Sequence, residues 1–216
     1  MLKRVPASYS VIGVVVAVVA ITLVADYSLS AGRYWDFGNG LGFAALAGLI
    51  CLGLITPKAS SLKVHLAIAY TTIVIVLLHA LWFLLGDEIA LQYILPGAPI
   101  SMWAGILAFV LSIFLTVTAL PSYRYRSHYN HRYFRHWHLW LSVLVMAATL
   151  YHIIGSGLYI RSWPQYVLLA IIALISFRGA NVVRADSLSN SGATVLFIIA
   201  SLLCAVLFTG VRSIAS

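Results

Sequence analysis

Seven stretches of this chain are apolar enough, and long enough or nearly so, to cross the hydrocarbon core of a membrane as helices. Only 8% of the residues are charged, whereas about a quarter are charged in a typical soluble domain. In a chain of 216 residues, seven such segments leave little room for loops and none for a separate soluble domain. We therefore expect an all-α integral membrane protein that forms a single transmembrane domain over residues 1–216, a bundle of about six to seven transmembrane helices. The expected helices lie near Ser10–Ala25, Leu41–Ile55, Val64–Leu85, Ile100–Leu120, His136–Gly155, Pro164–Phe177 and Ala193–Val211.

Lysine and arginine residues indicate how the chain is oriented. If the N-terminus is cytoplasmic and the helices alternate in direction, ten Lys and Arg residues fall on the cytoplasmic side and three fall outside. Such an excess is typical of cytoplasmic loops, and it accounts for the net charge of +8 without a nucleic-acid partner. The apolar run after Met1 has no clear small-residue cleavage site, so we expect a first membrane helix rather than a signal peptide. The sequence thus predicts an integral membrane protein with a cytoplasmic N-terminus.

Two of the expected helices each carry two histidines that are fourteen residues apart. His65 and His79 lie on one helix, and His138 and His152 lie on the other. Fourteen residues of α-helix turn by about 1400°, only about 40° short of four full turns, and rise by about 21 Å. Both histidines of a helix therefore share one face and span most of a hydrocarbon core of about 30 Å. Both helices run outward, so His65 matches His138 in depth near the cytoplasmic side, and His79 matches His152 nearer the outside.

These four histidines suit heme better than a bare metal ion. Ionisable residues well inside a spanning segment are rare and usually functional. Histidines fourteen residues apart cannot share one ion, and two-histidine sites for zinc or copper would lack further ligands because no acid or cysteine lies beside them. Heme supplies four equatorial nitrogens itself, so two histidines complete the coordination of the iron. We predict two stacked b-type hemes, an inner one bound by His65 and His138 and an outer one bound by His79 and His152.

The remaining histidines and the two cysteines are not expected to bind a cofactor. His136 points about 200° away from His138 around the helix, and His128 and His131 lie in an expected loop. We interpret these three histidines as facing the surface or a partner. The cysteines form neither a CxxC nor a CxxCH motif, which argues against structural zinc, a dithiol redox site and covalent heme. Both cysteines, Cys51 and Cys204, lie inside apolar stretches.

The two histidine motifs resemble the hallmark of a known membrane family. They read His65-LAIAYTTIVIVLL-His79 and His138-LWLSVLVMAATLY-His152, which is similar to the H-x13-H pattern of the ferric reductase-like transmembrane family of ferric reductases and NADPH oxidases. In size and layout the chain is also similar to the heme-binding membrane subunit of a bacterial periplasmic methionine sulfoxide reductase system. The resemblance covers roughly residues 41–177 and implies that electrons enter at the inner heme and leave at the outer one.

The chain departs from the oxidases after its sixth expected helix. In those proteins a flavin and nicotinamide domain follows, whereas here a short polar loop leads to a seventh apolar helix, and no G-x-G-x-x-G motif is present. The resemblance therefore implies an oxidoreductase component that needs a separate electron donor, either a cytoplasmic flavoprotein reductase that carries the flavin or a quinol in the membrane. The acceptor on the outside would be ferric iron, oxygen or a partner protein.

Two other interpretations remain open at this stage. The chain would instead be a heme-free transporter or a structural membrane subunit, although its helices carry almost no carboxylates of the kind that line polar pathways. A retinal protein would need a Schiff-base lysine in the last helix, and no lysine follows Lys63. The loop Pro121–Arg135, with five aromatic residues and four arginines, would contact anionic lipids, dock an electron donor or bind the inner heme propionates.

Overall fold

The computed structural model describes residues 5–24, 30–55, 62–120, 131–178, 183–184 and 190–215. Apart from two strands of two residues each, the regular secondary structure of the described residues is helical, so the all-α prediction is confirmed. The elements are β1 (Val5–Pro6), α1 (Ala7–Leu23), α2 (Arg33–Leu54), α3 (Leu62–Gly86), α4 (Glu88–Leu91), the 3-10 helix η1 (Gln92–Ile94), α5 (Ile100–Ala119), α7 (His131–Ser156), α8 (Trp163–Arg178), β2 (Val183–Arg184) and α9 (Asn190–Ala215).

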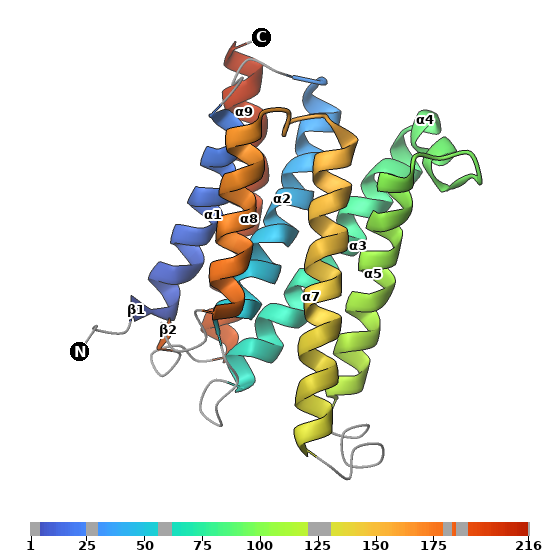
Figure 1. Ribbon diagram of the computed structural model, residues 1–216. Coiled ribbons are helices and arrows are strands. Elements are labelled where there is room, and N and C mark those ends of the chain that lie inside the picture. Colours follow the sequence, from blue (N-terminus) through green and yellow to red (C-terminus); the bar gives the residue numbers. More distant parts are fainter. Residues whose placement is uncertain are drawn as a thin grey trace. The chain divides into compact units, whose positions relative to one another are not determined.

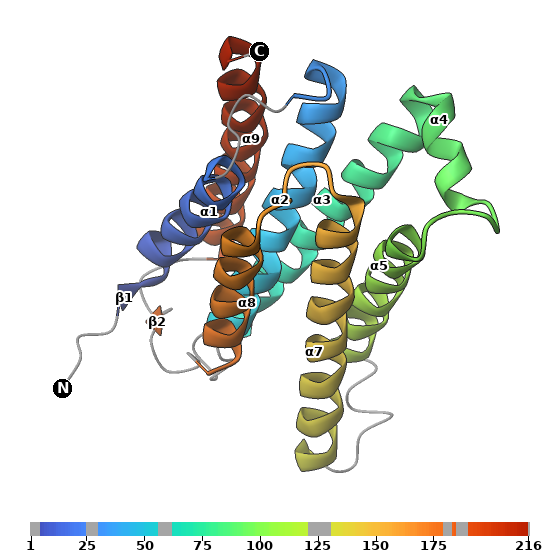
Figure 2. The same cartoon turned by 45° about the horizontal axis from the view of Figure 1, so that its top comes forward.

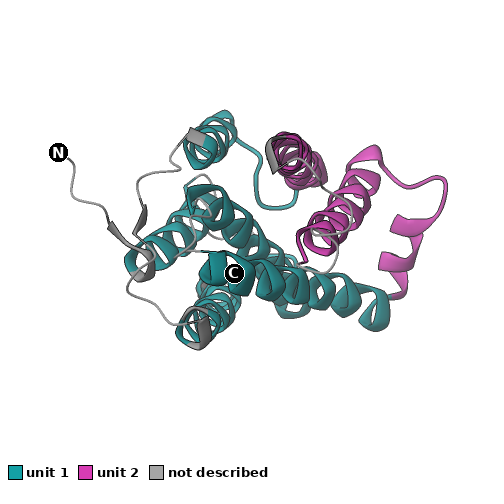
Figure 3. Cartoon of the chain, turned by 90° about the horizontal axis from the view of Figure 1, so that it is seen from below, with its two compact units in different colours: residues 1–87, 158–216 teal, residues 88–157 magenta. Residues whose placement is uncertain are grey.

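The chain divides into two compact units, which we describe separately. Unit 1 comprises Met1–Asp87 and Leu158–Ser216, and unit 2 comprises Glu88–Gly157. Figure 3 shows the two units in different colours. Unit 1 therefore contains α3 with its two histidines, and unit 2 contains α7 with the other two.

Helix α2 is the centre of unit 1 and packs against α1, α3, α8 and α9. Helices α1, α3 and α9 run in one direction, and α2 and α8 run in the other (Figure 1). The glycines of α2 allow this close packing. A Cβ atom added to Gly40 would lie 2.7 Å from the Cα atom of Ala205 on α9, and one added to Gly48 would clash with the hydroxyl group of Thr72 on α3. Small residues at such contacts are typical of packed membrane helices, because they let the backbones approach.

The two short strands belong to unit 1. β1 pairs in parallel with β2, with Val5 opposite Val183 and Pro6 opposite Arg184. Figures 1 and 2 both show this pair beside the first turn of α1. The pairing brings the segment before α1 next to the segment between α8 and α9.

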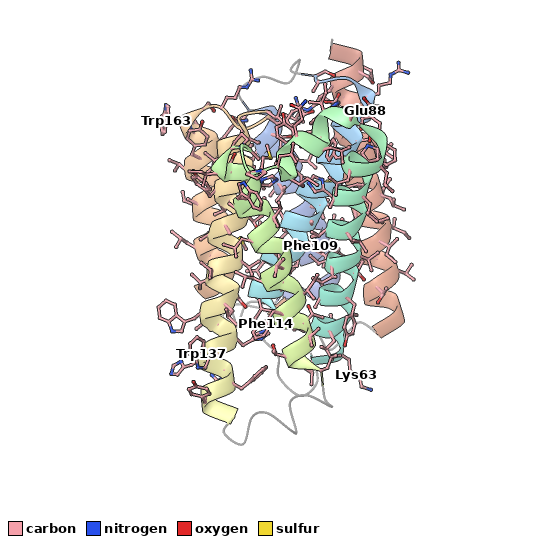
Figure 4. The ribbon with its side chains drawn as sticks, turned by 90° about the vertical axis from the view of Figure 1, so that its right-hand side faces the viewer. Lys63, Glu88, Phe109, Phe114, Trp137 and Trp163 are labelled. Atoms are coloured by element: carbon pink, nitrogen blue, oxygen red, sulfur yellow. The ribbon has the colours of Figure 1, made fainter. Side chains whose placement is uncertain are left out.

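Unit 2 is built on the antiparallel pair of α5 and α7. Gly155 of α7 lies against α5, where an added Cβ atom would be 2.6 Å from the Cβ atom of Ser101. Helix α4 and the 3-10 helix η1 precede α5 and form two short elements that the hydropathy pattern does not predict. Glu88 and Trp137 mark opposite ends of unit 2, as Lys63 and Trp163 do for unit 1 (Figure 4).

Within the described ranges, five helices are long and apolar enough to cross a membrane. They are α2, α3, α5, the segment Tyr133–Ser156 of α7 and the segment Thr194–Ile214 of α9. Their lengths and composition are compatible with an integral membrane protein. Helices α1 and α8 are also apolar but shorter, so their crossing of the membrane stays a prediction.

Two helices begin five or more residues earlier than the hydropathy pattern predicts. Helix α2 starts at Arg33 rather than near Leu41, and α7 starts at His131 rather than near His136. The first turns of both helices are rich in polar and charged residues, which hydropathy assigns to loops. In α2 the acidic Asp36 lies in the first turn, where a negative charge is favourable next to the unpaired N–H groups.

Candidate functional site

His79 of α3 packs directly onto the backbone of α2 in unit 1. Its Nδ1 atom lies 2.7 Å from the carbonyl oxygen of Gly38, and because a carbonyl can only accept, the ring donates from Nδ1. Gly42 lies four residues after Gly38, and a Cβ atom there would be 2.9 Å from Cε1 of His79. Phe83 meets the same imidazole ring edge-on, with the ring centroids 5.3 Å apart. The ring of His79 is therefore fixed by a backbone carbonyl, a glycine and an aromatic neighbour.

His152 of α7 packs onto α5 in unit 2 in the same way. Its Nδ1 atom lies 2.9 Å from the carbonyl oxygen of Ser101, so it donates a hydrogen bond to that carbonyl. Gly105 lies four residues after Ser101, and a Cβ atom there would be 2.8 Å from Nδ1 of His152. The acceptor and the glycine are thus separated by one helical turn in both units.

His65, near the start of α3, finds a different kind of acceptor. Its Nδ1 atom lies 3.1 Å from the carbonyl oxygen of Ile55, the residue that caps the C-terminal end of α2. Carbonyl groups at this end of a helix have no donor within the helix. The bond to His65 therefore uses an acceptor that the helix itself leaves available.

His138, near the start of α7, is half-buried. Its ring lies against that of Phe134, with the centroids 5.3 Å apart and the planes tilted by 35°. Its backbone carbonyl accepts a hydrogen bond of 2.7 Å from the hydroxyl of Ser142. Four residues separate His138 from each of these two side chains, so both contacts belong to the same face of α7.

The hydrogen bonds suit three of these histidines for binding iron through Nε2. When Nδ1 donates to a carbonyl, the nitrogen that can face a metal is Nε2, and metal-binding histidines almost always donate their other ring N–H in this way. The described ranges hold no group of three or more His, Cys, Asp and Glu side chains arranged to bind a metal ion. Heme needs only two protein ligands because the porphyrin supplies the other four. The donor set therefore fits heme.

The structure places the predicted ligands on two helices in different units. His65 and His79 belong to unit 1, and His138 and His152 belong to unit 2. The pairing of His65 with His138 and of His79 with His152 stays a prediction from their spacing. His136 is exposed, as predicted. His131, which the sequence predicts to lie in a loop, is instead the first residue of α7. Its side chain, His128 and the rest of residues 121–130 lie outside the described residues.

A buried carboxylate in unit 1 was not anticipated from the sequence. Asp36 is fully buried. Its Oδ2 atom accepts a hydrogen bond of 2.6 Å from the hydroxyl of Ser30, and its Oδ1 atom accepts one of 3.2 Å from the backbone N–H of Ala31. Oδ1 also accepts a hydrogen bond of 2.5 Å from the hydroxyl of Tyr159. Burial and this hydrogen bond raise the pKa of the Tyr159 phenol.

Arg212 of α9 completes this buried polar cluster of Asp36, Tyr159 and Arg212. It is fully buried, and its guanidinium donates a hydrogen bond of 2.9 Å to the backbone carbonyl of Thr22 on α1. The guanidinium lies 4.6 Å from the ring centroid of Tyr159 and 4.4 Å from that of Phe208, within the range of cation–π attraction. The cluster joins α1, α2, α9 and the segment between α7 and α8. In the sequence, this cluster is indicated by an acidic residue, Asp36, and an arginine, Arg212, that border apolar segments.

Comparisons with known proteins add no relative to this account, since no protein-family model, curated protein or solved structure matches the chain. The histidines themselves are therefore the basis for assigning a function.

Proposed function

We propose that this protein is a diheme b-type cytochrome that carries electrons across a membrane. His65 and His138 bind the inner heme iron, and His79 and His152 bind the outer one. The observation that carries the proposal is the Nδ1 hydrogen bond to a backbone carbonyl at His65, His79 and His152. Three half-buried histidines that each donate from Nδ1 to a backbone carbonyl, on helices that are long and apolar enough to span a membrane, suit metal binding better than simple packing.

The residues of the chain would orient the cofactor and adjust its properties. Heme supplies reversible one-electron chemistry at iron when it is bound. The carbonyls of Ile55, Gly38 and Ser101 hold the Nδ1 protons, which fixes the tautomer of each ring and raises the basicity of Nε2. Helices α3 and α7 are apolar enough to span a membrane, which would limit the access of water to the electron path. Two histidines at each iron leave no open coordination position, which favours outer-sphere transfer.

The remaining steps require partners of defined chemistry. With the N-terminus in the cytoplasm of a bacterium and the protein in the inner membrane, a flavoprotein reductase or a quinol would reduce the inner heme. Ferric iron, oxygen or a partner protein would accept the electron from the outer heme, as in the ferric reductase-like family. Anionic lipids would contact the basic segment Pro121–Arg135 on the cytoplasmic side.

A transporter function has one observation in its favour, the buried carboxylate of Asp36. Intramembrane carboxylates often mark the path of an ion or a proton. Asp36, however, lies in the first turn of α2 and accepts hydrogen bonds from Ser30, Ala31 and Tyr159. Such a satisfied carboxylate at a helix end is better explained as a link between helices, so we favour the cytochrome.

Single histidine variants test the proposal. We expect His79→Ala and His152→Ala to lose the outer heme and to keep the inner one, and His65→Ala and His138→Ala to do the reverse. The matched control is His136→Ala, because His136 is exposed on the same helix as His138. Visible spectra before and after dithionite, with heme quantified as pyridine hemochrome, measure the outcome. Unchanged heme content in the four ligand variants would refute the assignment.

A further inference from the structure

The rings of His79 and His152 are held by the same backbone device in two separate helix pairs. Each ring donates from Nδ1 to a helix carbonyl, and each lies against the glycine four residues further along that helix. We call these two arrangements the imidazole cradles: Gly38 and Gly42 on α2, and Ser101 and Gly105 on α5. Both host helices come just before the histidine helix and run antiparallel to it within their unit (Figure 1).

The glycine is required by the geometry of each cradle. The carbonyl of a helical residue points toward the residue four positions later, so a ring that bonds this carbonyl enters the space of that later side chain. An added Cβ atom would lie 2.9 Å from Cε1 and 3.1 Å from Nδ1 of His79. At Gly105 it would lie 2.8 Å from Nδ1 and 3.0 Å from Cε1 of His152. A methyl group at either position therefore has to displace the imidazole.

The inner ligand His65 does without such a glycine. Its acceptor is the carbonyl of Ile55, the C-cap residue of α2, rather than a carbonyl in the interior of that helix. The two cradles thus differ from the arrangement at His65. They also arise from unlike sequences, GNGLG on α2 and SMWAG on α5. Their common features are the carbonyl and the glycine one turn later.

We propose that Gly42 and Gly105 are positioning residues of the outer heme, an inference that rests on the proposed function. By admitting the imidazoles to the carbonyls of Gly38 and Ser101, they set the plane of each ring and the strength of its Nδ1 hydrogen bond. A stronger bond at Nδ1 raises the basicity of Nε2 and stabilises ferric iron, which lowers the reduction potential of the heme. Neither glycine is crowded by His65 or His138, the proposed ligands of the inner heme.

The test compares Gly42→Ala and Gly105→Ala with wild type and with the control Gly13→Ala, all as heme-loaded protein. Gly13 is a helical glycine with open space around its missing Cβ atom. Alanine is the better helix former, so any loss reflects the histidine contact rather than helix propensity. The readouts are the low-spin electron paramagnetic resonance signals and the midpoint potentials of the two hemes, with the outer heme assigned by its loss in His79→Ala.

We expect the outer-heme signal to shift in both glycine variants, its midpoint potential to rise, and the inner heme and the Gly13→Ala protein to match wild type. Loss of the outer heme alone would also support the inference. Outer-heme signals that are unchanged in both variants, or equal shifts of both hemes, would overturn it. A wild-type protein without heme would instead refute the proposed function, so the two failures are distinct.

A second measurement covers variants that fail to fold. Nitrogen-15 spectra of histidine-labelled wild-type protein report which ring nitrogen carries the proton. The cradles require His79 and His152 to be protonated at Nδ1, because each of these atoms faces a carbonyl. Protonation at Nε2 in either ring would overturn the inference without any glycine variant.

Discussion

Replacement of Tyr159 by phenylalanine tests the buried polar cluster with a minimal change. The substitution removes one hydroxyl group, whose oxygen lies 2.5 Å from Oδ1 of Asp36. It keeps the packing of the ring against Phe43, Phe208 and the guanidinium of Arg212. The effect therefore reports the hydrogen bond to the carboxylate rather than a cavity in the core.

The structure sets the size of this effect. A hydrogen bond to a charged group contributes about 1.5–3 kcal/mol to stability. Asp36 keeps its donors from Ser30 and Ala31 in the variant, so we expect a loss in the lower half of that range, about 1.5–2 kcal/mol. For a chain of this size 1 kcal/mol corresponds to about 2–4 °C, so the Tm should fall by about 3–8 °C.

Thermal unfolding of the purified protein in detergent measures this loss. The matched control is Tyr151→Phe, which removes a hydroxyl from a tyrosine that is 52% exposed on α7. We expect the control to unfold at the wild-type temperature. A Tyr159→Phe protein with the same Tm as the control would refute the reasoning, because the bond to Asp36 would then contribute nothing to the fold.

Three further predictions follow from the same contacts. The pKa of Tyr159 is raised above its ordinary value of 10, so the native state still holds this proton at a pH where the unfolded chain has lost it. The free energy of unfolding, measured at a series of pH values, should therefore fall as the pH rises above 10, and more steeply in wild type than in Tyr159→Phe. Gln165→Leu removes a buried amide that accepts three hydrogen bonds and donates two, and we expect a Tm loss larger than that of Tyr159→Phe. Gly40→Ala should lower the Tm more than Gly13→Ala, because its Cβ atom would lie 2.7 Å from the backbone of Ala205 whereas the one at Gly13 meets nothing; equal Tm values would contradict the packing of α2 on α9.

Hydropathy predicts most of the helices because each apolar segment is a local property of the chain. Helices α3 and α5 begin within two residues of the expected positions. The early start of α2 could not be predicted, since it depends on partners of Asp36 that are distant in sequence, such as Tyr159, 123 residues away. The short helices between α3 and α5 have four and three residues, too few for a repeating pattern of apolar residues to predict them.

The histidines show the same division between local and distant information. The shared face of His65 and His79 follows from their spacing along one helix. The cradle at His79 joins residues 41 positions apart, and the one at His152 joins residues 51 positions apart. Such contacts depend on the register between neighbouring helices, which a single sequence does not specify. A glycine four residues after the acceptor can be recognised as part of a cradle only once that register is known.

The proposed cytochrome holds two b-type hemes in one chain, each with two histidine ligands. The most direct measurement is the amount of heme per chain in the purified protein, by pyridine hemochrome, together with its oxidised and dithionite-reduced visible spectra. We predict two b-type hemes with low-spin spectra. One heme per chain would show that one of the two histidine pairs does not bind heme. A colourless protein from cells with ample heme would show that neither pair does.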